Sequence, residues 1–175
     1  YSGNEIINRN NKSNIHFTNF IDNKNIANTI YFTPNNTTDG NTIYLKDESD
    51  NNAIKLYNCG PQTNKSFSID YSKNKNKLYT TYYNSYNKKL YLNILSNNDY
   101  TSLNLIEIDA ESKTNAMSGQ KYNAIKSFIN QDSGNEEIMI VYYDNTAKKI
   151  VTCLYNNEKE DVKKSIRLLR KNLIT

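Results

Sequence analysis

The chain has 175 residues, a net charge of +4, and 37% hydrophobic against 23% charged residues. Its 15 Tyr and 19 Ile argue against a wholly disordered chain, and its 5 Gly and 2 Pro exclude collagen-like and proline-rich classes. Because the sequence contains no run of about 18 apolar residues, it predicts no membrane-spanning helix. The excess of Asn (32), and of Lys (19) over Arg (3), indicates an AT-rich genome, so Asn-rich and Lys-rich stretches carry little functional weight.

Along the chain, an irregular N-terminal segment at residues 1–13 precedes a β-rich domain at residues 14–157. The domain consists of short runs rich in Ile, Tyr, Thr, Phe or Leu, bounded by clusters of Asn, Asp, Ser and Lys, a pattern typical of strands and turns. The predicted strands are 15–21, 29–33, 42–45, 53–57, 66–71, 78–83, 90–95, 103–108, 123–129, 138–143 and 150–155.

An internal repeat relates residues 78–97 to residues 138–157 at an offset of 60 without a gap. Both copies contain Tyr-Tyr, a polar turn that ends in Lys-Lys, and apolar residues in the same phase, so each predicts a β-hairpin. A weaker third copy lies at residues 30–45. With one flanking run on each side, a hairpin becomes an antiparallel four-strand meander, which suits one sheet of a β-sandwich or one propeller-like blade. Both arrangements stay open, since three blades would not close a ring alone.

Residues 158–175 lose the alternation of the β-type runs. Apolar residues recur there at helical spacing, acidic residues come first and basic residues last, as a helix dipole favours. The apolar stripe comprises Val162, Ile166, Leu169 and Leu173. The segment is therefore predicted to form one basic amphipathic C-terminal helix, which packs on the β-core or docks a partner. The candidate partner-binding cations are Lys163, Arg167 and Arg170.

The residue types that support catalysis or metal binding are scarce. His16 is the only histidine and lies in a predicted strand, so a His-rich metal site is excluded. No glycine-rich phosphate-binding motif is present. Cys59 and Cys153 have neither redox nor zinc spacing, and they form either one long-range disulfide or two buried thiols. We expect no catalytic residue, no metal site and no cofactor.

Tyrosines of the repeated hairpins are the candidate ligand-binding residues, because Tyr combines a flat apolar face with a hydroxyl at low entropic cost. They are Tyr82, Tyr83, Tyr86, Tyr142 and Tyr143. Since neighbouring residues on a strand point to opposite faces, one tyrosine of each adjacent pair is expected in the core.

These features predict a non-catalytic, extracytoplasmic binding or adhesion module, or a subunit of a surface assembly, with a protein or glycan ligand. One alternative is an intracellular interaction protein that docks a partner or an anionic membrane surface through its basic helix. Another is a carboxylate-dependent enzyme, such as a glycoside hydrolase fragment. Nucleic acid is disfavoured as a partner because the basic segment lacks interleaved aromatic residues. Oligomerisation is compatible with the repeat, and the expected location is extracellular or at the cell surface.

Overall fold

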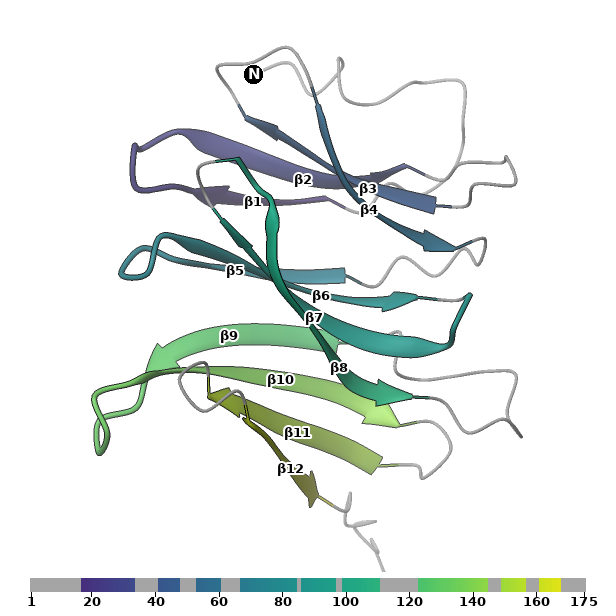
Figure 1. Ribbon diagram of the computed structural model, residues 1–175, viewed down its shortest axis with the longest axis vertical. Coiled ribbons are helices and arrows are strands. Elements are labelled where there is room, and N and C mark those ends of the chain that lie inside the picture. Colours follow the sequence, from purple (N-terminus) through teal and green to yellow (C-terminus); the bar gives the residue numbers. More distant parts are fainter. Residues whose placement is uncertain are drawn as a thin grey trace, which may run out of the picture. The chain divides into compact units, whose positions relative to one another are not determined.

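The structure is a computed structural model that describes most of the strands and tight turns of the chain. The residues described are 17–33, 41–47, 53–60, 67–84, 86–96, 99–110, 123–144, 149–156 and 161–167. Within these residues, 12 strands form three antiparallel sheets of four strands each (Figure 1). In every sheet, strands that follow one another in sequence are neighbours, so each sheet is a meander. The prediction of a mainly β fold built of four-strand meanders is confirmed.

The chain divides into two compact units, residues 1–65 and residues 66–175, which we call unit 1 and unit 2. Unit 1 holds the first sheet. Its strands are β1 (Phe17–Ile21), β2 (Ala27–Thr33), β3 (Asn41–Asp47) and β4 (Ile54–Gly60). Alternation places Ile30, Ile43 and Leu45 on one face, where they are buried. On the other face Tyr31 stacks on Tyr44, with 5.7 Å between ring centroids.

Unit 2 holds the second and third sheets. The second sheet comprises β5 (Phe67–Ser72), β6 (Lys77–Asn84), β7 (Lys89–Ser96) and β8 (Ser102–Ala110). The third sheet comprises β9 (Asn123–Ile129), β10 (Glu136–Asp144), β11 (Lys149–Asn156) and β12 (Asp161–Arg167). The first strands of the two sheets, β5 and β9, lie against one another.

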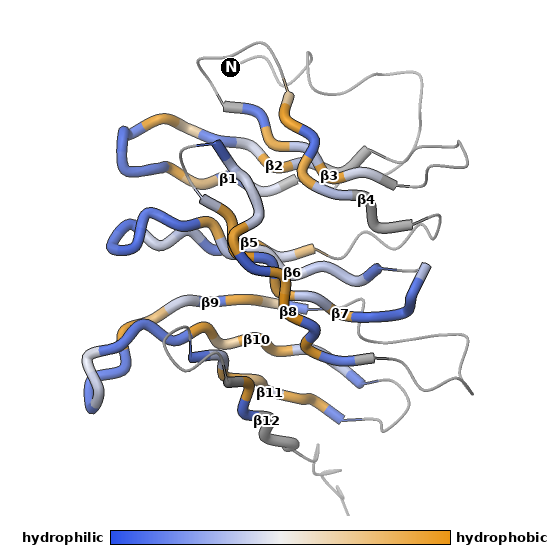
Figure 2. Tube along the Cα trace, in the orientation of Figure 1, coloured by the Kyte–Doolittle hydropathy of each residue, from blue (hydrophilic) through white to orange (hydrophobic). Residues whose placement is uncertain are grey.

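One hydrophobic core joins the two sheets of unit 2. It comprises Tyr79, Leu90, Leu92, Ile94 and Ile108 from the second sheet, and Ile125, Ile138, Ile140, Tyr142, Val151, Cys153 and Tyr155 from the third. Those from β7, β10 and β11 alternate along their strands, so one face of each of these strands enters the core. In Figure 2 the strands of unit 2 carry the hydrophobic residues and the tight turns between them are hydrophilic.

The two copies of the sequence repeat are hairpins with the same register. In β6–β7 the pairs run from Lys77↔Ser96 to Asn84↔Lys89. In β10–β11 they run from Glu137↔Asn156 to Asp144↔Lys149, which is the same pairing displaced by 60 residues. The weaker third segment spans β2 and β3, which also pair as a hairpin.

The C-terminal helix predicted for residues 158–175 is wrong at residues 161–167, which form β12. This strand pairs with β11 from Asn156↔Asp161 to Ile150↔Arg167. The spacing of Val162 and Ile166 does not distinguish the two structures, because residues four apart share a face in both a helix and a strand. The backbone edge of β11 offers hydrogen-bond partners to residues 161–167, and this tertiary pairing overrides local helix propensity there.

Several expectations lie outside the described residues. They concern the irregular segment at 1–13, His16, and the part of the predicted helix after residue 167, including Leu169, Arg170 and Leu173. In the part of the chain that the structure describes, no helix has the length and apolar character needed to cross a membrane.

Candidate ligand-binding site

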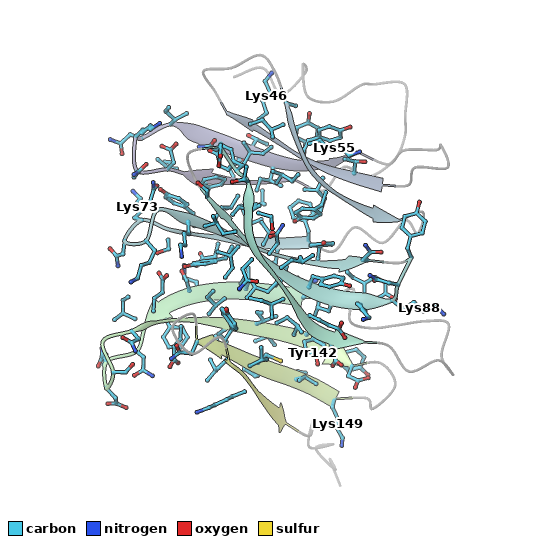
Figure 3. All side chains as sticks on the ribbon, in the orientation of Figure 1. Lys46, Lys55, Lys73, Lys88, Tyr142 and Lys149 are labelled. Atoms are coloured by element: carbon cyan, nitrogen blue, oxygen red, sulfur yellow. The ribbon has the colours of Figure 1, made fainter. Side chains whose placement is uncertain are left out.

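Unit 2 contains a pocket of about 180 Å³ where the β5–β6 turn meets the end of β9 and the start of β10. The pocket is lined by Tyr71, Ser72, Lys73, Asn74, Ser127, Phe128, Ile129 and Glu136. Figure 3 labels Lys73 on the β5–β6 turn. Aromatic, cationic, amide, hydroxyl and carboxylate groups thus converge on one small space, as in sites that bind small molecules.

The β5–β6 turn holds one wall of the pocket in a fixed conformation. Asn76 has a φ of 50°, the left-handed conformation that Asn tolerates better than most residues. Its side-chain oxygen accepts a hydrogen bond of 2.7 Å from the Tyr71 hydroxyl. The backbone N–H of Lys75 donates to Ser72 Oγ at 3.2 Å. These bonds leave Lys73 and Asn74 exposed at the rim of the pocket.

The β9–β10 turn is organised around Asn130, which follows the pocket residue Ile129. The Asn130 N–H donates to the Asn135 carbonyl, and the Gly134 N–H donates to the Asn130 carbonyl, both at 2.8 Å. The Asn130 side-chain oxygen also accepts the Asp132 N–H at 2.9 Å. Gly134 has a φ of +69°, which a residue with a Cβ adopts only with strain.

A buried carboxylate is among the residues that line the pocket. Glu136 is 6% exposed, and its two oxygens accept hydrogen bonds from the hydroxyls of Ser72 and Tyr79. Burial, together with the hydrogen bond to Glu136, raises the pKa of Tyr79 above its ordinary value of 10.0. Glu136 therefore ties the third sheet to two strands of the second sheet.

A row of polar side chains on β5 continues this connection along β9. Ser68, Asp70 and Ser72 share one face of β5, and we call them the β5 polar row. Ser68 Oγ accepts the Ile125 N–H at 3.1 Å, and Asp70 Oδ2 accepts the Ser127 N–H at 2.6 Å. These side chains therefore bind backbone amides of β9 in place of a neighbouring strand.

Asp70 is the most heavily used acceptor of this row. Besides the Ser127 N–H, it accepts the Ser127 hydroxyl at 2.5 Å and pairs with Lys126 at 2.8 Å between Nζ and Oδ1. The three contacts fix the backbone and side chain of Ser127, which forms part of the pocket wall.

The tyrosines predicted from the hairpins occupy different surroundings. Tyr82, Tyr83 and Tyr142 are buried, Tyr143 is half-buried, and Tyr86 is 56% exposed. The Tyr142 hydroxyl donates to Asp109, and burial followed by this hydrogen bond raises the pKa of Tyr142. None of the five is among the described residues that line the pocket. Their role as ligand contacts stays a prediction.

The other predicted site residues are also dispersed. Lys163 is exposed on β12, Arg167 ends the same strand, and Arg170 lies outside the described residues. Cys153 is buried in the core of unit 2, whereas Cys59 belongs to β4 of unit 1. Partner binding by the three cations and the disulfide between the two cysteines stay predictions.

Reasoning from sequence missed the residues of the pocket. A signal was present in Ser68, Asp70 and Ser72, which alternate with the apolar Phe67, Ile69 and Tyr71. Such a strand is ordinarily interpreted as having one solvated face. The partners of this polar face lie 57 to 64 residues away in sequence, so the sequence alone does not bring them together.

No protein-family model matches the chain, and no curated protein matches it. Among solved structures, the chain is similar to a fucose lectin from Kordia zhangzhouensis that was determined in complex with methyl-fucoside. The TM-score is 0.49 and the sequence identity 9%, over 87% of this chain and 97% of the lectin. Values this low do not establish a common fold, so the bound sugar is a property of the lectin alone.

Proposed function

We propose that the chain is a non-catalytic binding module that receives one ring of a glycan in the pocket of unit 2. The observation that carries the proposal is the lining of this pocket. Tyr71 and Phe128 supply aromatic surface, while Lys73, Asn74 and Ser127 supply polar groups. A sugar ring combines apolar C–H faces with hydroxyls around its edge, so it matches such a mixed lining.

The size of the pocket supports a ligand group of one ring. Its volume of about 180 Å³ is below the range of roughly 300–1,000 Å³ that is usual for drug-sized ligands. A longer glycan would therefore extend past the rim at Lys73 and Asn74, where both side chains are exposed.

The state of the nearby carboxylates supports binding rather than hydrolysis. A glycosidase needs two carboxyl groups that face the scissile bond and exchange protons with it. Here Glu136 accepts two protein hydroxyls, and Asp70 accepts the Ser127 amide and hydroxyl and pairs with Lys126. Both carboxylates are thus engaged in holding the two sheets together.

The alternative function required a basic helix that docks a partner or a membrane. Residues 161–167 of that predicted helix form a strand, so this part of the chain does not support it. A glycan-binding module instead fits an extracellular or cell-surface location and a role in adhesion or in a surface assembly. This location and these roles are part of what we propose.

The test is a screen of the labelled chain against immobilised glycans, followed by calorimetric titration of any glycan bound. Lys73→Ala and Phe128→Ala should each weaken binding at least about tenfold, a loss of about 1.4 kcal/mol. The matched control is Lys24→Ala, because Lys24 is an exposed lysine in the β1–β2 turn of unit 1. Binding that survives both pocket variants, or no binding to any glycan, would refute the proposal. Hydrolysis of the bound glycan would refute its non-catalytic part.

A further inference from the structure

The third sheet has a second face, opposite to the core, that is also apolar. Ile138, Ile140 and Tyr142 of β10 enter the core, so the residues between and after them point the other way. The pairing Met139↔Leu154, Val141↔Thr152 and Tyr143↔Ile150 puts six side chains on this opposite face. We call Met139, Val141, Tyr143, Ile150, Thr152 and Leu154 the outer face. All six are half-buried, and Thr152 is the one side chain among them without a large apolar part.

The sequence repeat shows what such a face does elsewhere in the same molecule. The residues 60 positions earlier are Tyr79, Thr81, Tyr83, Leu90, Leu92 and Ile94 of the second sheet, which hold the same places in the same hairpin register. Tyr83 is 6% exposed, and the other five are 0% to 1% exposed. Four of them belong to the core that is completed by the third sheet. In the second sheet, therefore, the face equivalent to the outer face is the one on which another four-strand sheet packs.

One row across the outer face ends in a lysine on each side, whereas Ala124 and Phe128 of β9 continue the apolar surface on either side of Lys126. Lys126 of β9 pairs with Met139, and Lys163 of β12 pairs with Leu154, so a row across the sheet has apolar residues in the centre and a lysine at each end. Both lysines are exposed, and Lys126 also pairs with Asp70 of β5. An apolar centre with a charged rim is the anatomy of a protein–protein interface.

We propose that the outer face is an interface with a second copy of this chain, which supplies the covering four-strand sheet. A second copy carries sheets of the required kind, and the second and third sheets show that two such sheets pack face to face. The proposal does not rest on glycan binding, and Phe128 of the pocket lies at the β9 edge of the same sheet face.

The test is the mass in solution of residues 1–175, measured over a range of concentrations by light scattering and sedimentation equilibrium. The unchanged chain should form a dimer. Val141→Lys, at the centre of the outer face, should weaken association at least about 100-fold, because it buries an unpaired charge. Thr152→Lys should do the same, and it starts from a polar side chain, so it keeps the test valid if Val141→Lys fails to fold.

The matched control is Leu103→Lys, which places the same charge on an apolar residue of β8 that is 55% exposed. This variant should remain dimeric. A chain that is monomeric at high micromolar concentration would overturn the proposal. The outer face would then be covered by something other than a second copy, such as unit 1 or a further repeat of a longer polypeptide. Dimerisation that survives both outer-face variants, or that is lost in the control, would overturn it too.

Discussion

Glu136 is a buried carboxylate whose two oxygens hold hydroxyls of the neighbouring sheet. Glu136→Ala should lower the free energy of unfolding by about 2–4 kcal/mol, because it leaves the Ser72 and Tyr79 hydroxyls without their acceptor in a buried site. Glu136→Gln should cost less, since it keeps the shape and one acceptor. Urea denaturation monitored by circular dichroism measures both changes.

The matched control is Glu107→Ala, which removes an exposed carboxylate that pairs with Lys89. This change should leave the free energy of unfolding nearly unaltered, because exposed ion pairs contribute little. Equal effects of the two alanine variants would contradict a structural role for Glu136.

Two buried tyrosines should make the protein sensitive to alkali. Burial and hydrogen bonds to carboxylates raise the pKa of Tyr79 and of Tyr142 above 10.0. The folded state therefore keeps these protons when the unfolded state loses them. Their contribution to stability is full below about pH 10 and falls as the pH rises, with a slope of about 1.4 kcal/mol per pH unit for each tyrosine.

The slope is measured from urea denaturation between about pH 9 and about pH 11. Tyr79→Phe and Tyr142→Phe should each reduce it, whereas Tyr86→Phe changes a side chain that is 56% exposed and serves as the control. An alkaline slope that is the same in all three variants would show that these two phenols do not cause it.

At the scale of elements, the β5 polar row joins β5 to β9 through side chains. Asp70→Ala removes the acceptor of the Ser127 N–H and hydroxyl and the partner of Lys126. We expect a loss of about 2–4 kcal/mol in the free energy of unfolding, and faster hydrogen exchange at the Ser127 amide than at amides in the middle of β10. If the Ser127 amide exchanges as slowly in the variant as in the unchanged chain, the hydrogen bond to Asp70 is not what protects this part of β9.

The elements also show how far the sequence determines the fold. Alternating apolar residues and polar turns sufficed to predict the hairpins β6–β7 and β10–β11. They did not suffice for β12, because the spacing of Val162 and Ile166 suits a strand as well as a helix. The pocket was missed for a different reason. Asp70 and Ser127 lie 57 residues apart, and only the packing of β5 on β9 makes them neighbours.

At the scale of the whole molecule, unit 2 has a core of its own. Every residue of the core cluster lies between residues 66 and 175. We expect residues 66–175, produced alone, to fold with β-type circular dichroism and a single cooperative transition in urea. The control is the same fragment with Ile140→Asp. This variant should not fold, because the substitution buries a charge in the core. A fragment that unfolds gradually would show that this core needs residues 1–65.

The identical register of the hairpins β6–β7 and β10–β11 also defines how this architecture can grow. Because the two hairpins are 60 positions apart without a gap, one block of 60 residues contains one meander together with its connection, although β9 pairs with β10 four residues out of the frame in which β5 pairs with β6. An added meander would present the same two faces as its predecessor. A polypeptide of this kind can therefore lengthen in steps of one sheet, and a deletion or insertion of any other size between the hairpins would have to be absorbed by a loop.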